Sequence, residues 1–251
     1  MTLGKNPELL VIGYLYNQGF IKKTEDLKSV QVDWDVESAV VVTRGGISNL
    51  EKRLEKRTVT SGCGQGTVFG DMMEDLDKIK LNSPALRQSS FYRLLKNIRE
   101  YNEVYKKSGA VHGCALCKDE KIEIFIEDVG RHNATDAIAG YMLLEQIDGS
   151  DKLFYTTGRL TSEMVIKVAQ MGIPILFSRA GITKMGLELS QKLGVTTISR
   201  AAGKHFLVYN GAETVIYDAK PSEKTDSRFH SSGGSEESPA HDRRRGAELS
   251  T

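Results

Sequence analysis

The sequence is poor in cysteine, proline and tryptophan, with three, five and one of them among 251 residues. A small, odd number of cysteines does not supply the disulfide framework of a small secreted domain, which favours a reducing compartment. No apolar run approaches the roughly 20 residues of a membrane-spanning helix, and residues 1–6 lack the basic-then-apolar layout of a signal peptide. We therefore expect a cytoplasmic protein with no membrane partner.

An excess of charge of one sign is also missing. The 34 basic and 33 acidic residues leave a formal net charge of +1, so there is no general electrostatic case for nucleic acid as a partner. Hydrophobic residues make up 39% and charged residues 27% of the chain. This balance is typical of a globular protein with room for one large domain or two small ones.

The final segment, residues 219–251, has few aliphatic residues and is rich in serine, glycine, glutamate and arginine. Such a composition cannot bury enough apolar surface to offset the entropy lost on ordering. We predict a disordered tail, in which the three arginines at 243–245 are solvated rather than a nucleic-acid patch.

Hydrophobic periodicity predicts two regions of regular structure. In the first, a helix begins at Asn6-Pro7 and runs through Tyr16, strands follow at 29–36 and 39–43, and a second long helix opens at Ser83-Pro84. From residue 121 onward, strands alternate with helices. The strands are predicted at 122–126, 153–156, 173–177, 195–198, 206–209 and 215–217, and the helices at 132–144, 162–170 and 183–193. This alternation predicts an α/β domain with helices layered on a largely parallel sheet.

One thiol is distinguished by its small neighbours. Residues 60–67 read TSGCGQGT, so Cys63 is flanked by glycine and hydroxyl residues rather than by apolar side chains. Glycine permits tight turns and close approach of a ligand, which leaves the sulfur reachable. Reactivity also requires thiolate character, supplied by nearby cations or a helix N-terminus. Cys63 is therefore the candidate nucleophile, with a structural turn as the alternative.

Polar turns follow four of the predicted strands. They contain Arg131, Arg159, Arg179 and Arg200, each with a glycine nearby. Because ligands bind beyond the carboxyl ends of parallel strands, these arginines and the adjacent helix N-termini predict a site for phosphate or pyrophosphate. The sequence has no Walker A run and no G-x-G-x-x-G, so a standard ATP or NAD site is not expected. Surface loops that contain Arg and Gly without function are the alternative.

The second chemical cluster is the H-x-C-x-x-C run formed by His112, Cys114 and Cys117. It offers three zinc ligands, but it lacks the glutamate and the proline that zinc deaminases place beside theirs. A redox or relay role for the two cysteines is a second interpretation, and a buried strand end around Ala115 and Leu116 is a third. We expect no metal in this protein.

Three further side chains near residue 130 have open roles. His132 could orient phosphate, carry a proton or cap the local helix. Asp128 and Asp136 are expected to fix the turn rather than to react.

Longer motifs resemble those of one family. Residues 127–134 (EDVGRHNA), 158–165 (GRLTSEMV), and 172–174 with 178–180 (GIP and SRA) are similar to hallmarks of the formate dehydrogenase accessory sulfurtransferases, the FdhD family. Residues 60–66 resemble the catalytic cysteine loop of that family. The order and spacing of the motifs agree from about Thr2 to Tyr217.

The resemblance implies a fold. It predicts a small α/β domain at 1–84 that ends with the catalytic cysteine loop, and a cytidine-deaminase-like three-layer α/β domain at 85–218. The disordered tail at 219–251 follows, and the protein is expected to be a homodimer.

The resemblance also implies an activity. Family members accept sulfur from a PLP-dependent cysteine desulfurase as a cysteine persulfide. They pass it to the molybdenum or tungsten of a bis-guanine-dinucleotide pterin cofactor before that cofactor enters formate dehydrogenase. Cys63 matches the persulfide-bearing cysteine of this sulfurtransferase, and GDP-like ligands are expected to mimic the cofactor. The stretch that contacts the cofactor matches Arg200, Ala201, Ala202, Gly203, Lys204 and His205.

The sequence departs from the family at three positions. Gly66 replaces the second cysteine of a C-x-x-C loop, which excludes a disulfide relay within the loop and leaves open whether Cys114 or Cys117 substitutes. Arg200 and Ala202 stand where relatives usually have an aromatic and a basic residue. A non-catalytic carrier of the same cofactor is therefore the alternative function, and a zinc-dependent nucleobase deaminase is a third hypothesis.

Overall fold

The structure, a computed structural model, describes residues 1–47, 57–60, 66–69, 76 and 78–219. Residues Met1–Lys220 form one compact unit. The second unit, Pro221–Thr251, lies outside the described residues, as does Cys63. The disordered tail and the boundary between a small and a larger domain therefore stay predictions.

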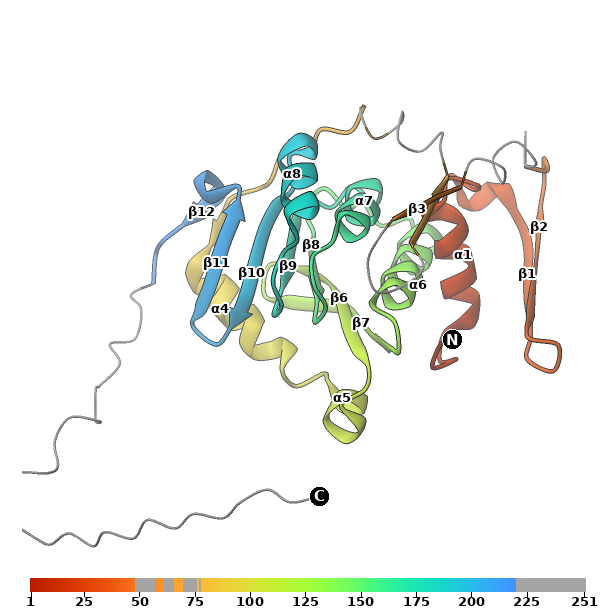
Figure 1. Ribbon diagram of the computed structural model, residues 1–251, viewed down its shortest axis with the longest axis horizontal. Helices are drawn as coiled ribbons and strands as arrows, with labels where there is room; N and C mark the ends of the chain where they lie inside the picture. The colour runs from red at the N-terminus through yellow and green to blue at the C-terminus, as the bar shows by residue number, and fades with distance from the viewer. Residues whose placement is uncertain (48–56, 61–65, 70–75, 77, 220–251) are drawn as a thin grey trace, which may run out of the picture. The chain divides into compact units, whose positions relative to one another are not determined.

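A six-stranded sheet forms the centre of the unit (Figure 1), with the strand order β11-β10-β9-β8-β6-β7. Its strands are β6 (His112–Lys118), β7 (Lys121–Asp128), β8 (Leu153–Thr156), β9 (Ile175–Ser178), β10 (Thr196–Ala202) and β11 (His205–Asn210). The central strands β8, β9 and β10 are parallel. β6 is antiparallel to β7 and β8, and β11 is antiparallel to β10.

The mixed α/β class is confirmed, but the expected largely parallel sheet is wrong at its two sides. Asp119 and Glu120 alone connect β6 to β7, and Gly203 and Lys204 alone connect β10 to β11. A two-residue connection joins antiparallel neighbours, whereas parallel neighbours need a long crossover. Asp119 and Gly203 take the positive φ values that suit such tight turns, 52° and 63°.

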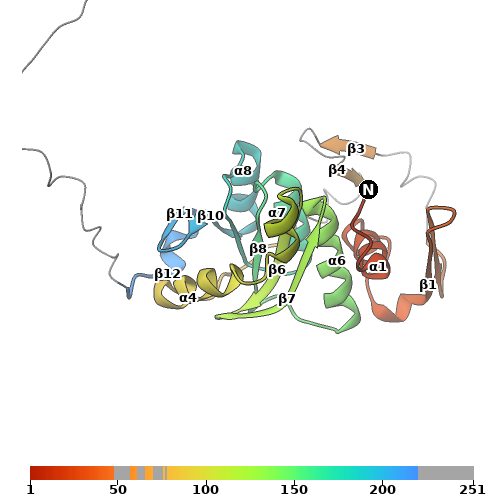
Figure 2. The same ribbon diagram turned by 90° about the horizontal axis from the view of Figure 1, so that it is seen from below.

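Helices cover both faces of the sheet, and Figure 2 shows α4 (Gln88–Ile98) and α8 (Lys184–Leu193) on opposite sides of it. The helices α6 (Arg131–Leu144), α7 (Ser162–Gln170) and α8 contribute to one core, and α4 contributes to the other. Alternate side chains of β6 separate these cores, because Cys114 and Leu116 face α6 and α7 whereas Ala115 and Cys117 face α4. The three layers agree with the predicted architecture, and the closer likeness to cytidine deaminases stays a prediction.

Helix α1 (Pro7–Asn17) packs on α6 at a crossing of two glycines. A Cβ atom at Gly13 would lie 1.6 Å from the carbonyl oxygen of Asp136, and one at Gly140 would lie 2.1 Å from that of Leu9. Only glycine lets two backbones approach this closely. The predicted helix at Pro7 is confirmed, although the side chain of Asn6 makes no cap hydrogen bond.

The second long helix begins later in the chain than the sequence predicts. The prediction that a helix opens at Ser83-Pro84 is wrong, because Leu86 and Arg87 are extended and pair in parallel with the last strand, and the helix begins at Gln88.

Within the described ranges, no helix is long and apolar enough to cross a membrane. The remaining elements are β1 (Leu27–Asp33) with β2 (Ser38–Thr43), β3 (Arg57–Thr60) with β4 (Gly66–Phe69), β5 (Leu86–Arg87) with β12 (Val215–Ile216), α5 (Glu103–Ser108), η1 (Thr24–Asp26) and η2 (Ala212–Thr214).

Candidate functional site

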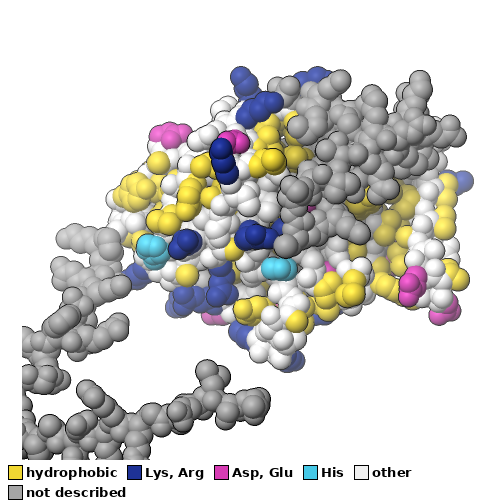
Figure 3. All heavy atoms as spheres, in the orientation of Figure 1, with side chains coloured by type: hydrophobic (Ala, Val, Ile, Leu, Met, Phe, Trp, Pro, Cys, Tyr) yellow, Lys and Arg dark blue, Asp and Glu magenta, His cyan; other side chains and the backbone are white. Residues whose placement is uncertain are grey.

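Two cavities meet at the edge of the sheet where β8, β9 and β10 end. Arg179, the residue after β9, lines both of them, and the two cavities together are called the crevice below. On the face shown in Figure 3, lysine and arginine side chains gather with histidine side chains near the β10–β11 hairpin and α5. The α4 cavity, of about 170 Å³, is lined by Leu95, Ile98, Arg99, Asn102, Tyr155, Arg179, Ala201 and Ala202. The α5 cavity, of about 480 Å³, is lined by Tyr105, Gly109, Ala110, Val111, His112, Thr157, Arg179 and Ala180.

The α5 cavity contains hydrogen-bonding groups that suit an anion. His112 Nδ1 lies 3.1 Å from Thr157 Oγ1, and the backbone N–H of Gly113 donates to the same hydroxyl at 3.1 Å. Burial, together with the positive charge of Arg131, lowers the pKa of His112, so the imidazole is neutral near pH 7. Among the lining residues, Arg179 therefore supplies the positive charge of this cavity. His112 and Thr157 are neutral groups that can orient a bound ligand.

The α4 cavity combines apolar walls with cationic groups. Leu95, Ile98 and Ala201 supply the apolar surface, and Arg99 and Arg179 supply two guanidinium groups. Burial raises the pKa of Tyr155, although Arg179 opposes this shift, so its hydroxyl stays protonated. Apolar walls with a few charged groups fit a planar ring that carries an anionic substituent.

The predicted cofactor stretch from Arg200 to His205 forms the end of β10, the turn and the start of β11. Arg200 has a φ of 52°, and its N–H donates to the carbonyl oxygen of Ala180 at 3.0 Å. Ala201 is buried and lines the α4 cavity with Ala202, whereas Arg200, Lys204 and His205 are exposed. The structure thus brings two of the six predicted residues into the crevice, and the contact of this stretch with a cofactor stays a prediction.

The four arginines that the sequence placed in register have different environments. Arg179 alone among them lines the described cavities. Arg131 is buried against the loop that follows β8, where a Cβ atom at Gly158 would lie 2.4 Å from its Cδ. Arg159 is exposed beyond the end of β8. Arg99 could not be predicted from the sequence, because a charged residue after a helix carries no signal of the cavity that it enters.

A buried charged network lies behind the crevice, between α6 and α7. His132 Nε2 is 3.3 Å from Glu163, and Lys167 lies 2.7 Å from Asp136 and 3.9 Å from Glu163. Burial, together with the positive charges of Lys167 and Arg131, lowers the pKa of His132 to about 3. Burial raises the pKa of Glu163. With so low a pKa, His132 is a weak base that stays neutral at physiological pH, which does not favour a role as a carrier of protons.

Asp128 fixes the local turn, as the sequence predicted. Its carboxylate accepts hydrogen bonds from the Gly130 N–H at 3.1 Å and from Asn133 Nδ2 at 2.8 Å. It also accepts from the hydroxyl of Thr2 and from the N–H of Leu3 at 3.0 Å. The turn that begins α6 is thereby tied to the first residues of the chain.

Cys114 and Cys117 lie in the centre of β6, and their side chains are fully buried. They point to opposite faces of the sheet, so they cannot join His112 around one metal ion, and the zinc interpretation is wrong for these residues. Burial raises the pKa of Cys114 to about 11 and also raises that of Cys117. The buried-strand interpretation is confirmed, and both thiols are protonated at neutral pH.

Cys63 falls between β3 and β4, outside the described residues. The strands on either side of it pair in an antiparallel hairpin, in which Thr60 is opposite Gly66. The role predicted for its thiol therefore stays a prediction.

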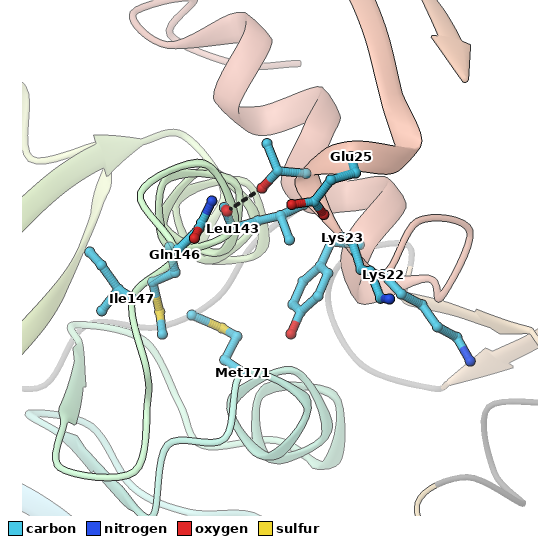
Figure 4. Close-up of a pocket in the computed structure, with 10 residues that line it drawn as sticks. Lys22, Lys23, Glu25, Leu143, Gln146, Ile147 and Met171 are labelled. Carbon is cyan, nitrogen blue, oxygen red and sulfur yellow. Dashed lines mark hydrogen bonds between the residues drawn. The ribbon is translucent and has the colours of Figure 1, made fainter. Parts of the chain in front are cut away.

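A third cavity, of about 290 Å³, lies at the C-terminal end of α6, whereas Arg131 and the crevice lie at its N-terminal end. Figure 4 shows Gln146, Ile147 and Met171 on one side of it and Lys22, Lys23 and Glu25 on the other. Thr24 Oγ1 donates to the carbonyl oxygen of Leu143 at 2.8 Å and closes one wall. Lys22, Lys23 and Glu25 give the opening of this cavity charges of both signs, which favour no single class of ligand. The crevice is therefore the stronger candidate site.

Comparison with known proteins agrees with the motifs. The FdhD/NarQ family profile matches residues 1–216. A relative from Bacillus pumilus, named sulfur carrier protein FdhD, is 32% identical over 202 residues, which cover 80% of this chain and 77% of the relative. A protein of the same name from Wolinella succinogenes is 33% identical over 212 residues, covering 83% of this chain and 73% of the relative.

A solved structure shares the fold. It is described as a formate dehydrogenase accessory protein, comes from Desulfotalea psychrophila, and superposes with a TM-score of 0.68 at 27% sequence identity. The alignment covers 86% of this chain and 82% of that chain. The resemblance inferred from the sequence motifs is therefore confirmed over most of the chain.

Proposed function

The chain belongs to the FdhD/NarQ family, and from this premise we propose that it is a sulfur carrier required for formate dehydrogenase activity. Its relatives carry the name sulfur carrier protein FdhD, and its structural neighbour is described as a formate dehydrogenase accessory protein. The proposal has two parts, a cargo that the crevice binds and a thiol that carries the sulfur.

The proposed cargo is the molybdenum or tungsten bis(pterin guanine dinucleotide) cofactor, which is the substrate of the sulfur transfer. Its phosphates are anionic and its bases are planar. The crevice supports this choice, because Arg179 offers a guanidinium to both cavities and Leu95 and Ile98 offer apolar walls to a ring. This junction of two cavities at one arginine is the observation that carries the proposal.

The stretch from Arg200 to His205 is the proposed contact surface for the cofactor. Ala201 and Ala202 line the α4 cavity, so a base in that cavity would touch the backbone of β10. Lys204 and His205 are exposed at the turn and are available to phosphates outside the cavity. Arg200, in place of the usual aromatic residue, would exchange a stacking contact for a charged one.

The proposed carrier is Cys63, which makes the protein a sulfurtransferase. Its thiolate attacks the terminal sulfur of a persulfide on a cysteine desulfurase, and the cysteine thiolate of the desulfurase leaves. The persulfide on Cys63 then gives its terminal sulfur to the metal of the cofactor. A metal that arrives in its reduced state would give up two electrons as this sulfur becomes a sulfide ligand, and the Cys63 thiolate would be released.

The proposed partners follow from this sequence of transfers. A PLP-dependent cysteine desulfurase supplies the sulfur, and formate dehydrogenase receives the cofactor. We also propose that the protein is cytoplasmic and acts as a homodimer. The buried and protonated states of Cys114 and Cys117 argue against either as a second relay thiol.

Complementation tests the proposal in cells that lack their own sulfur carrier for formate dehydrogenase. The wild-type chain is expected to restore formate dehydrogenase activity, and Cys63→Ala is expected to fail at equal protein levels. If the wild-type chain restores nothing, the proposed function is contradicted. If Cys63→Ala restores as much activity as the wild type, the alternative of a cofactor carrier without sulfur transfer is supported, since that carrier needs no thiol.

A further inference from the structure

The short helix α5 forms a shared wall of the crevice. Asn102, the residue before it, lines the α4 cavity, and Tyr105 and Gly109 line the α5 cavity. The helix has only six residues, from Glu103 to Ser108. A helix of this length is not stable on its own, so its position must be set by contacts from elsewhere in the chain.

The first turn of α5 is held by a side chain from the sheet. Glu127, near the end of β7, accepts a hydrogen bond from the Val104 N–H at 2.8 Å through one carboxylate oxygen. It accepts another from the Tyr105 N–H at 2.9 Å through the other oxygen. These amides are the second and third of the helix, the two that a capping side chain usually binds.

The residue at the N-cap position itself does not bind these amides. Asn102 occupies the N-cap position, but its side-chain amide donates to the carbonyl oxygen of Ile98 at 3.3 Å, and it makes no cap hydrogen bond. Glu127, a residue that is 8% exposed, replaces it from 22 and 23 residues away. The negative charge also complements the positive end of the helix, and hydrogen bonds to an ionised group are the stronger kind.

We propose that Glu127 is a positioning residue of the crevice, which sets α5 against Arg179 and thereby determines the affinity for a nucleoside diphosphate ligand. This inference rests on the proposed function for the identity of the ligand. Glu127 is not among the described residues that line either cavity, so it acts through the helix that it holds. A ligand that spans both cavities contacts residues on each side of α5, so a loosened α5 weakens its binding.

The variant Glu127→Gln tests this role with a minimal change of shape. Glutamine keeps one acceptor for the two amides and places an NH₂ group, which is a donor, against the other. The matched control is Glu123→Gln, which removes a carboxylate four residues earlier on β7. Glu123 pairs with Lys152 at 3.1 Å, on another part of the surface.

The measurements are the GDP dissociation constant by calorimetry, amide hydrogen exchange at residues 104–108 and the melting temperature, on the full-length wild type and both variants. We expect Glu127→Gln to weaken GDP binding about tenfold, equivalent to about 1.4 kcal/mol, and to lose exchange protection in α5. Glu123→Gln should bind GDP as the wild type does. The melting temperatures of the two variants should be similar, which separates positioning from a general loss of stability.

Each other outcome overturns the inference. Retained protection in Glu127→Gln would show that the carboxylate does not hold α5. Lost protection with an unchanged dissociation constant would show that α5 does not determine affinity. If wild-type protein does not bind GDP, the nucleotide part of the proposed function fails first, and the ligand role of Glu127 fails with it. The exchange data would still decide whether Glu127 holds the first turn of α5.

Discussion

Lys167 and Asp136 form a buried ion pair between α7 and α6. The ammonium nitrogen lies 2.9 and 2.7 Å from the two carboxylate oxygens, and their side chains are 6% and 4% exposed. Asn17 of α1 donates to the same carboxylate at 2.7 Å. Residues of three helices therefore meet at the Asp136 carboxylate, which lies one helical turn after His132 on α6.

Removal of the lysine is expected to destabilise the protein strongly. Lys167→Met keeps the apolar stem but leaves the Asp136 carboxylate buried without its cation. We expect the free energy of unfolding to fall by about 3–5 kcal/mol, measured by urea denaturation. The control is Lys184→Met: the amine of Lys184 lies 3.7 Å from Glu188 on the surface, and the lysine side chain is 91% exposed. Exposed pairs contribute at most about 1 kcal/mol, so equal losses in the two variants would contradict the importance of the buried pair.

The pH dependence of stability should report His132. Its pKa is about 3 in the folded protein, against an ordinary value of 6.5. Between these values the unfolded chain binds a proton that the folded protein does not, so stability falls as the pH falls. From pH 7 to pH 5 the loss from this group is expected to be about 2 kcal/mol.

Glu163 offsets part of that loss. Burial raises its pKa, so the folded protein takes up this proton at a higher pH than the unfolded chain does. Urea unfolding of His132→Gln across the same pH range should show a flatter dependence than the wild type. His205→Gln, a change of an exposed histidine, should leave the slope as it is. A wild-type slope in His132→Gln would assign the acid sensitivity to other groups.

The thiols should differ sharply in reactivity. The Cys114 thiol, with a pKa of about 11, is almost entirely protonated at pH 8, and the burial of Cys117 has the same effect. In the native protein at pH 8, iodoacetamide is expected to modify Cys63 and to spare the two buried thiols until urea unfolds the chain. Peptide mapping of the labelled protein identifies the sites. Rapid labelling of Cys114 or Cys117 under native conditions would contradict their placement inside the sheet.

Arg179 should be the arginine that matters for ligand binding. It lines both cavities, whereas Arg159 is exposed and is not among the described residues that line them. A hydrogen bond to a charged group contributes about 1.5–3 kcal/mol, so Arg179→Ala is expected to weaken GDP binding at least tenfold. Arg159→Ala, the matched control, should bind with the affinity of the wild type. Calorimetry at two salt concentrations checks both, and equal effects would show that net charge rather than the crevice binds the ligand.

Much of the fold could be predicted because its periodicity is strong. The strand at Leu153 and the helix at Ser162 have the predicted bounds, since each is a clear pattern between turn residues. β6 was missed as a complete strand because its central residues are all buried. Such a strand gives an unbroken apolar run instead of an alternating one.

The candidate site was predicted as an edge of the sheet but not residue by residue. Arg179 was expected there because parallel strands bring their carboxyl ends together. The burial of Arg131 against Gly158 could not be predicted, because it depends on a contact between residues far apart in the sequence. The contact of Glu127 with α5 was missed for the same reason, although its motif was recognised.

Intact-protein mass spectrometry shows whether Cys63 carries sulfur. The wild type and Cys63→Ala are each incubated with a cysteine desulfurase and L-cysteine and then measured with and without reductant. If Cys63 is the carrier, the wild type gains the mass of at least one sulfur atom, reductant removes it, and the variant gains none. A wild type without added sulfur, or a variant that gains as much as the wild type, would contradict this role of Cys63.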